Sequence, residues 1–108
     1  MNSSMHRPAS YASVLRPGLF AGQLHWVTGG GSGIGRCVAH ELASLGATVV
    51  LSGRTAEKLE RVAAEIADDG GRAVTRAFDI RDEEAVKANV AEIVAAHGPV
   101  HGLVNNAG

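Results

Sequence analysis

The 108-residue sequence has few of the residues that build several common kinds of site. Its one cysteine, Cys37, excludes an internal disulfide and a multi-cysteine metal site. No apolar run is long enough to span a bilayer. A formal net charge of −1 gives no general attraction to nucleic acid or to an anionic membrane. We therefore expect a cytoplasmic protein with neither nucleic acid nor membrane as a partner.

Candidates for catalysis and metal binding are equally scarce. The only tyrosine, Tyr11, lies within residues 1–22 and is not assigned a catalytic role. His97 and His101 have a ligand-like interval, but the Gly98-Pro99 pair breaks the helix that would align two imidazoles. We predict no metal site and no catalytic residue in this chain. We expect three further candidates to be structural residues: Cys37, His25 and His40.

Residues 1–22 are predicted to be an irregular N-terminal extension. Pro8, Pro17 and Gly18 interrupt them before a periodic pattern begins. They lack the apolar stretch of a secretory signal, while their serine and arginine content without acidic residues leaves a mitochondrial transit peptide as an alternative.

Residues 23–108 alternate between short β-branched runs and longer amphipathic stretches, with turn residues between them. The predicted strands are 24–28, 48–51, 73–78 and 100–104. Three helices are predicted. The first is 34–45. The second is capped by Thr55 and ends at 69–71. The third is 82–97 and carries Val86, Val90, Ile93 and Val94. Right-handed crossovers would place the strands in the order 3-2-1-4. The fold class is therefore α/β, a Rossmann-type doubly wound parallel sheet of which the chain holds the first half plus one strand, incomplete at the C-terminus.

The segment from Thr28 to Gly35 lies between the first predicted strand and helix. At such a junction unpaired backbone N–H groups and the helix dipole can hold a pyrophosphate. Gly29 would allow the tight turn, Gly33 the approach of the phosphate, and Gly35 close packing of helix on strand. Ser32 would add a hydroxyl donor. A glycine turn that only joins two elements is the alternative; a kinase-type phosphate loop is excluded because no Gly-Lys-Ser/Thr ending follows.

Three motifs in this order resemble the short-chain dehydrogenase/reductase family. They are Thr-Gly-x-x-x-Gly-x-Gly at 28–35, Asp79-Ile80 after the third strand, and Asn-Asn-Ala-Gly at 105–108. The resemblance implies that Asp79 accepts a hydrogen bond from the adenine amino group, with the backbone of Ile80 beside the ring, and that Asn105 ties neighbouring strands together. A helix-leading surface carboxylate is the alternative for Asp79. The implied cofactor-binding residues are Gly29, Gly31, Ser32, Gly33, Ile34, Gly35, Arg54, Asp79, Ile80, Asn106, Ala107 and Gly108.

The end of the second strand predicts which nicotinamide cofactor is used. Enzymes that prefer NAD usually carry an acidic residue there, which accepts both ribose hydroxyls. In this chain Gly53 and Arg54 stand at that place, and a guanidinium can grip a 2′-phosphate. We therefore expect NADP as the cofactor, with NAD as the alternative. The competing interpretation of Arg54 is an exposed arginine that faces only solvent.

The resemblance implies an oxidoreductase that moves hydride between nicotinamide and a carbonyl, alcohol or enoyl small-molecule substrate. Its catalytic serine and Tyr-x-x-x-Lys would lie beyond residue 108, so we expect this segment alone to be inactive. The alternative is a catalytically silent nucleotide-binding or interaction module. Residues 17–23 are similar to the lead-in of enoyl-CoA reductases and citronellol-type dehydrogenases, and the complete enzyme is expected to be a homo-oligomer.

Overall fold

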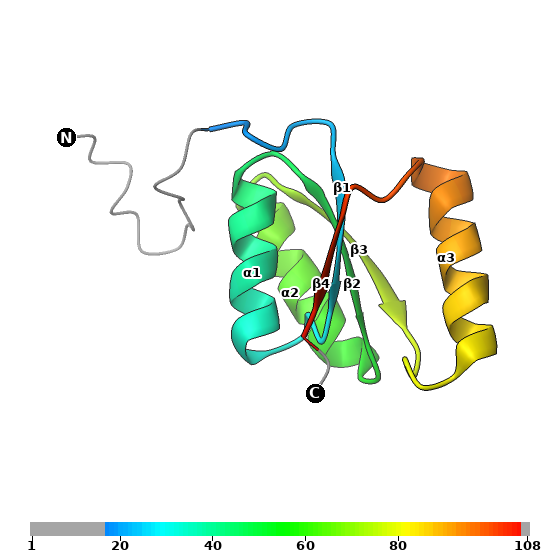
Figure 1. Ribbon diagram of the computed structural model, residues 1–108. Helices are drawn as coiled ribbons and strands as arrows, with labels where there is room; N and C mark the ends of the chain where they lie inside the picture. The colour runs from blue at the N-terminus through cyan, green and yellow to red at the C-terminus, as the bar shows by residue number, and fades with distance from the viewer. Residues whose placement is uncertain (1–16, 107–108) are drawn as a thin grey trace.

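The computed structural model describes residues 17–106, which form four strands and three helices in strict alternation (Figure 1). The elements are β1 (Leu24–Thr28), α1 (Gly33–Ser44), β2 (Thr48–Gly53), α2 (Ala56–Asp68), β3 (Arg72–Ala77), α3 (Glu83–His97) and β4 (Gly102–Asn105). All seven predicted elements are confirmed in kind and order.

The bounds of several elements differ from the prediction by one or two residues, and the start of α2 differs in its capping. β4 begins at Gly102 rather than at Val100, because the chain is still leaving the turn at Gly98 (φ 88°), although His101 N already donates to Leu24 O at 2.8 Å. Thr55 precedes α2 in an extended conformation, but its side chain makes no capping hydrogen bond. Its main-chain oxygen instead accepts from Leu59 N at 3.3 Å.

The sheet is parallel, with the predicted strand order β3-β2-β1-β4. Thr28 lies beside Ser52 on one neighbour and beside Asn105 on the other, while Gly53 pairs with Ala77. The carboxyl ends of all four strands therefore meet at one edge. The chain reverses its direction of travel across the sheet between β1 and β4, which is the point where ligands bind in open α/β sheets.

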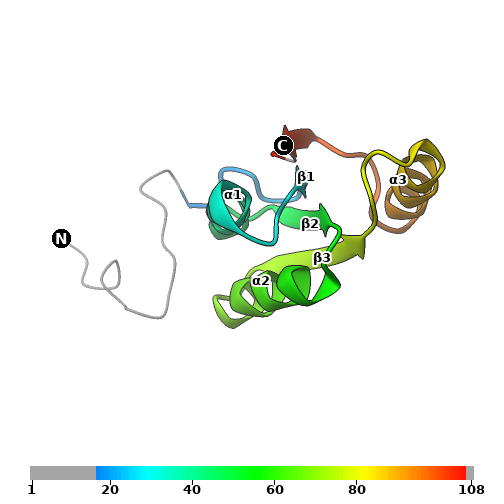
Figure 2. The ribbon, with the colours of Figure 1, turned by 90° about the horizontal axis from the view of Figure 1, so that it is seen from below.

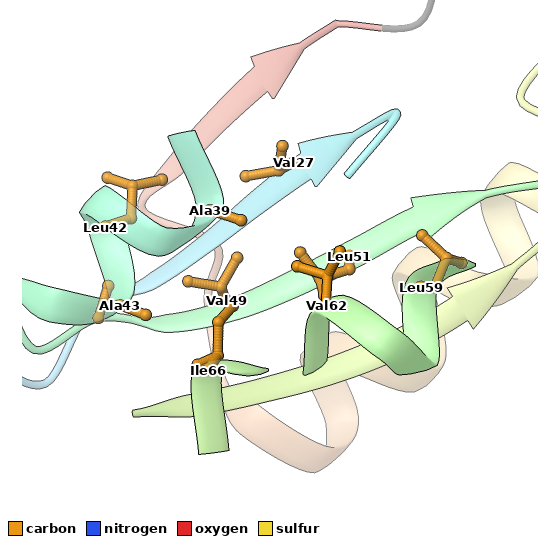
Figure 3. Packing of buried hydrophobic residues seen from close by; sticks show 10 residues of the cluster. Val27, Ala39, Leu42, Ala43, Val49, Leu51, Leu59, Val62 and Ile66 are labelled. Carbon is orange, nitrogen blue, oxygen red and sulfur yellow. The ribbon is translucent and has the colours of Figure 1, made fainter. Parts of the chain in front are cut away.

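Helices cover both faces of the sheet. α1 and α2 lie on one face and α3 on the other (Figures 1 and 2). Alternation along β2 sends Val49 and Leu51 toward α1 and α2, and Val50 toward the opposite face. A strand buried on both faces reads as an uninterrupted apolar run, which explains the sequence of β2. The larger core cluster comprises Val27, Ala39, Leu42, Ala43, Ala47, Val49, Leu51, Leu59, Val62 and Ile66 (Figure 3).

The face under α3 has a smaller core. Trp26, Val50 and Ile93 meet there, and the Trp26 ring packs edge-on against Phe78 with centroids 6.5 Å apart. The indole Nε1 donates to Ser52 Oγ at 2.9 Å, so the one polar atom of this buried ring is satisfied. Of the four apolar residues noted on α3 in the sequence, only Ile93 is buried.

Two others of these four residues, Val90 and Val94, are 40% and 43% exposed. α3 therefore contacts the sheet mainly through Ile93. In the described part of the chain no further helix lies beside α3 to cover them. None of the helices within residues 17–106 is long and apolar enough to cross a membrane.

Residues 17–22 form turns, as expected for the last part of the predicted extension; residues 1–16, including Tyr11, lie outside the described residues. Phe20 N donates to Leu45 O at 2.9 Å, and the Phe20 ring lies 4.9 Å from the His25 ring. Gly46 has φ 98° and ends the first crossover helix as predicted. The segment just before β1 is thus attached to the domain.

α1 and α2 are joined by a polar cluster on the surface of their layer. Glu65 accepts two hydrogen bonds from Arg36, at 2.9 Å each, and its Oε1 lies 2.8 Å from His40 Nε2. The hydrogen bond from Arg36 is the main cause of a lowered pKa for Glu65. His40 therefore has the structural role that was predicted, whereas Cys37 on the same helix is exposed.

Candidate functional site

The glycine loop is held against β2 by its own backbone. Gly29 N and Gly30 N both donate to Ser52 O, at 2.8 and 3.3 Å. Gly29 has φ 65°, a left-handed conformation that residues with a Cβ rarely adopt. The tight turn predicted at this glycine is present, and it sets the direction in which the chain enters α1.

Close packing explains the last glycine of the motif. A Cβ at Gly35 would overlap the carbonyl oxygen of Gly29 and would lie 2.8 Å from Asn106 Nδ2. A Cβ at Gly29 would in turn lie 3.2 Å from the main-chain oxygen of Asn106. The start of α1, the loop and the segment after β4 therefore meet at van der Waals distance, which confirms the packing role predicted for Gly35.

The N-terminus of α1 has features that favour an anion. Ser32 precedes the helix with extended backbone angles, and its side chain makes no capping bond. The first helical turn carries no acidic residue, and a Cβ at Gly33 (φ 60°) would meet nothing within 4 Å. Ile34 is 72% exposed. The first N–H groups of a helix have no intrahelical partner, so they and the helix dipole are available here.

Gly31 has different surroundings from the other glycines of the loop. A Cβ at this position would lie 2.9 Å from the Cβ of Lys58 and 3.5 Å from Leu59 Cδ2. Both neighbours belong to α2. Gly31 therefore lets the loop pass close to α2, and the geometry gives it a packing role in addition to the cofactor-binding role implied by the sequence.

A cavity of about 520 Å³ opens at the carboxyl edge of the sheet. It is bounded by the loop, by the ends of β2 and β3, and by the residue after β4. Its lining residues are Thr28, Gly29, Ser32, Ser52, Gly53, Arg54, Phe78, Asp79, Ile80, Arg81 and Asn106. The structure thus brings six of the predicted site residues to one cavity, whereas Ala107 and Gly108 lie outside the described residues.

The Thr28 hydroxyl links the end of β1 to the end of β4 in the cavity wall. Thr28 Oγ1 donates to Asn105 Oδ1 at 3.1 Å, with Val104 O a second acceptor at 3.3 Å, and it accepts from Asn106 N at 2.8 Å. The predicted role of Asn105 in tying neighbouring strands is confirmed. The role of Thr28 was not predicted, although its place at the head of the glycine motif marks it.

Asp79 and Arg81 form an ion pair at the cavity mouth. Asp79 Oδ2 lies 2.9 Å from Arg81 Nη2, and Asp79 Oδ1 accepts from the main-chain N of Arg81 at 2.9 Å. These hydrogen bonds lower the pKa of Asp79 to about 2, with a smaller contribution from the charge of Arg54. Asp79 is therefore ionised at any physiological pH. Sequence reasoning missed Arg81, because an opposite charge two residues after a strand-end carboxylate is too common to single this residue out.

Among residues 17–106, no three histidine, cysteine, aspartate or glutamate side chains gather as metal ligands would. The structural position predicted for His25 fits its contacts, and His101 also contacts β1. His25 Nε2 lies 2.8 Å from Gln23 Oε1, and His101 Nδ1 accepts from Leu24 N at 3.0 Å. Burial, followed by the nearby charge of His101, lowers the pKa of His25.

Comparisons of the sequence and of the structure with known proteins indicate the same family. The family model for short chain dehydrogenases matches residues 23–108. The citronellol catabolism dehydrogenase (AtuB) of Pseudomonas aeruginosa PAO1 is 66% identical, with a TM-score of 0.89 over 91% of this chain and 41% of that one. A metagenomic short-chain oxidoreductase in complex with NADP is 46% identical, with a TM-score of 0.81 over 82% of this chain and 40% of that one.

A third solved structure, an NAD+-bound xylitol dehydrogenase, is 36% identical, with a TM-score of 0.79 over 82% of this chain and 34% of that one. These similar structures therefore include an NADP complex and an NAD complex. The chain spans 36%, 38% and 33% of the length of three curated relatives that it matches.

Proposed function

Because the chain belongs to the short-chain dehydrogenase family, we propose that it binds the nicotinamide dinucleotide of an oxidoreductase that interconverts alcohols with carbonyls or reduces enoyl groups. One observation carries this proposal. The 520 Å³ cavity at the carboxyl edge of the sheet adjoins a helix N-terminus that has neither a capping bond nor an acidic residue. A cavity of this kind at the topological switch point suits a ligand with an anionic centre and an aromatic end.

The residues present fit such a ligand. The loop at Gly29 and Ser32 would hold the pyrophosphate against the first turn of α1, where the open space beside Gly33 lies. Asp79 and Ile80 would hold the adenine at the opposite end of the cavity, and Asn106 would lie along the adenosine ribose. When bound, the nicotinamide supplies hydride chemistry, while the residues of this chain bind and orient the cofactor.

The charges at the end of β2 support NADP(H) as the preferred cofactor. Arg54 lines the cavity and is close enough to Asp79 to lower the pKa of that carboxyl. Gly53 leaves the neighbouring position without a carboxylate that would repel a 2′-phosphate. A guanidinium forms paired, charge-assisted hydrogen bonds with phosphate oxygens, which favours NADP(H) over NAD(H).

We propose a small acyclic alcohol, or the corresponding carbonyl or enoyl compound, as the substrate class. The name of the 66% identical neighbour, a citronellol catabolism dehydrogenase, supports this choice. So does the similarity of residues 17–23 to the lead-in of citronellol-type dehydrogenases and enoyl-CoA reductases.

Calorimetric titration of the chain with NADPH and with NADH tests the proposal. We expect NADPH to bind more tightly in the wild type, and we expect the double substitution Gly53→Asp and Arg54→Ala to move the preference toward NADH by about tenfold or more, since charged hydrogen bonds of about 1.5–3 kcal/mol are removed and repulsion is added. A Cβ at Gly53 would meet only Leu59 Cδ2, at 3.5 Å, so the aspartate fits without strain.

The outcomes separate the two parts of the proposal. Failure of the wild type to bind either dinucleotide would contradict the function itself. A wild type that prefers NADH, or a double variant with an unchanged preference, would contradict only the role of Arg54. The single substitution Arg54→Lys is the matched control: it keeps the positive charge but removes the planar fork, so part of the NADPH preference should remain.

A further inference from the structure

The turn between β3 and α3 holds the Asp79 carboxylate in a fixed orientation. Phe78 N donates to Gly53 O at 2.8 Å, which fastens this end of β3 to β2 beside Arg54. Asp79 O accepts from Asp82 N at 3.0 Å and closes the turn. The side chain of Asp79 leaves this fastened segment at the cavity mouth and is 37% exposed. The position of its two oxygens is then decided by Arg81.

Arg81 contacts the carboxylate through three different N–H groups. The main-chain N lies 2.9 Å from Oδ1, and Nη2 lies 2.9 Å from Oδ2. Nε is shared, at 3.1 Å from Oδ1 and 3.3 Å from Oδ2. An ionised carboxylate has about four acceptor positions. Three N–H groups of Arg81 therefore leave room for about one more donor on Asp79.

The same pair balances charge in a site for a polyanion. An ionised Asp79 alone would repel the phosphates of a dinucleotide. Among the described residues that line the cavity, the cations are Arg54 and Arg81. With Arg81 beside Asp79, the pair is neutral and the cavity mouth keeps the net positive charge of Arg54. Arg81 itself is 75% exposed and can remain on Asp79 while a ligand enters.

We propose that Arg81 is a positioning residue for base recognition: by holding Asp79 with one acceptor position open, it makes the site select a purine whose 6-position donates a hydrogen bond. Adenine carries an amino donor there, whereas hypoxanthine carries a carbonyl oxygen that would face the carboxylate. The inference rests on the proposed dinucleotide site. Discrimination between the two bases is its signature, because a pair that only stabilised the turn before α3 would leave this ratio unchanged.

The test compares the affinities of NADPH and of reduced nicotinamide hypoxanthine dinucleotide phosphate, measured by calorimetry with the full chain. We expect the wild type to prefer the adenine form by about tenfold. Arg81→Lys keeps the charge but loses the fork, so the preference should fall to about threefold or less while most of the NADPH affinity remains. Arg81→Ala should lose both the preference and affinity, because Asp79 is then uncompensated.

Arg61→Ala is the matched control, since Arg61 is an exposed arginine of α2 outside the cavity, and it should change neither ratio nor affinity. Circular dichroism of each variant checks the fold. If Arg81→Ala does not fold, the Arg81→Lys variant alone provides the test of base preference. A wild type that binds no dinucleotide would overturn the proposed function and this inference together. A wild type that prefers adenine, with Arg81 variants that keep the full preference, would overturn the inference alone.

Discussion

The N-termini of α1 and α3 solve the same physical problem in different ways. Every helix begins with N–H groups that have no intrahelical partner. At α3, Asp82 accepts a hydrogen bond from Ala85 N at 3.2 Å, and Glu83 and Glu84 follow in the first turn. At α1, Ser32 makes no side-chain capping bond, and no acidic residue follows.

The difference separates a helix whose first N–H groups are capped by its own side chains from a helix whose first N–H groups are available to a ligand. α3 has its own negative charge and needs no anion. The start of α1 offers its dipole and its N–H groups to the cavity beside it, and the space next to Gly33 is open. The contrast predicts that substituting Ser32, the residue before α1, acts mainly on binding, and that substituting Asp82, the residue before α3, acts mainly on stability.

The largest effect is expected where α1 and its loop touch. In Gly35→Ala the new Cβ would overlap the carbonyl oxygen of Gly29, which is backbone and cannot rotate away. We expect a loss of about 1–3 kcal/mol or more in the free energy of unfolding, and no measurable NADPH binding. Urea denaturation and calorimetry measure the two effects.

Gly53→Ala is the control for this prediction, because its Cβ would meet only Leu59 Cδ2, at an ordinary 3.5 Å. It should unfold at nearly the same urea concentration as the wild type. Equal stability for Gly35→Ala and Gly53→Ala would show that the loop can move away from α1, contrary to the packing described above.

Converting the start of α1 into one like that of α3 should have the next largest effect. In Ser32→Asp a carboxylate would accept from the first-turn N–H groups and stabilise the helix by up to about 1 kcal/mol. The same charge would repel the pyrophosphate, so NADPH affinity should fall at least about tenfold, or 1.4 kcal/mol. Thermal unfolding and calorimetry should therefore change in opposite directions.

Ser32→Asn caps without a charge and isolates the repulsion; its NADPH affinity should fall less than that of Ser32→Asp. If Ser32→Asp gains stability and binds NADPH as well as the wild type, the phosphates lie elsewhere, and the comparison between the two helix starts fails.

The smallest effect is expected at α3. Asp82→Ala removes the capping bond to Ala85 N and should cost about 1 kcal/mol of stability, measured by urea denaturation. The dissociation constant for NADPH should stay within about twofold, because Asp82 does not line the cavity. Asp82→Asn keeps an acceptor and should recover most of the stability. A large loss of binding in Asp82→Ala would mean that both helix starts serve the ligand.

The glycine loop shows how far sequence reasoning reaches. The sequence predicts a tight turn at Gly29 and close packing at Gly35, and the structure shows the neighbouring atoms that require each glycine. These predictions succeed because a left-handed turn and a close helix approach exclude a Cβ whatever surrounds them. The second role of Gly31 depends on Lys58 and Leu59, almost thirty residues away, and no local pattern indicates such a neighbour.

The charged end of the cavity shows where sequence reasoning stops. Arg54 and Asp79 were predicted separately, one from the end of β2 and one from a family motif. Arg81 was missed, because an acid and a base two residues apart are common on protein surfaces and have no special meaning in sequence. Its three N–H contacts depend on the turn that Asp79 O closes with Asp82 N, which only the structure shows.

The sequence by itself determined the α/β class, the order of the seven elements and the place of the glycine loop. These follow from hydrophobic periodicity and from residues that tolerate only certain backbone angles, which are local properties. Tertiary structure decided that Val90 and Val94 stay exposed while Ile93 is buried, and that Arg54, Asp79 and Arg81 share one cavity. The physical reason is that parallel strands bring distant strand ends to one edge, so each side chain's neighbours are set by sheet register and helix docking.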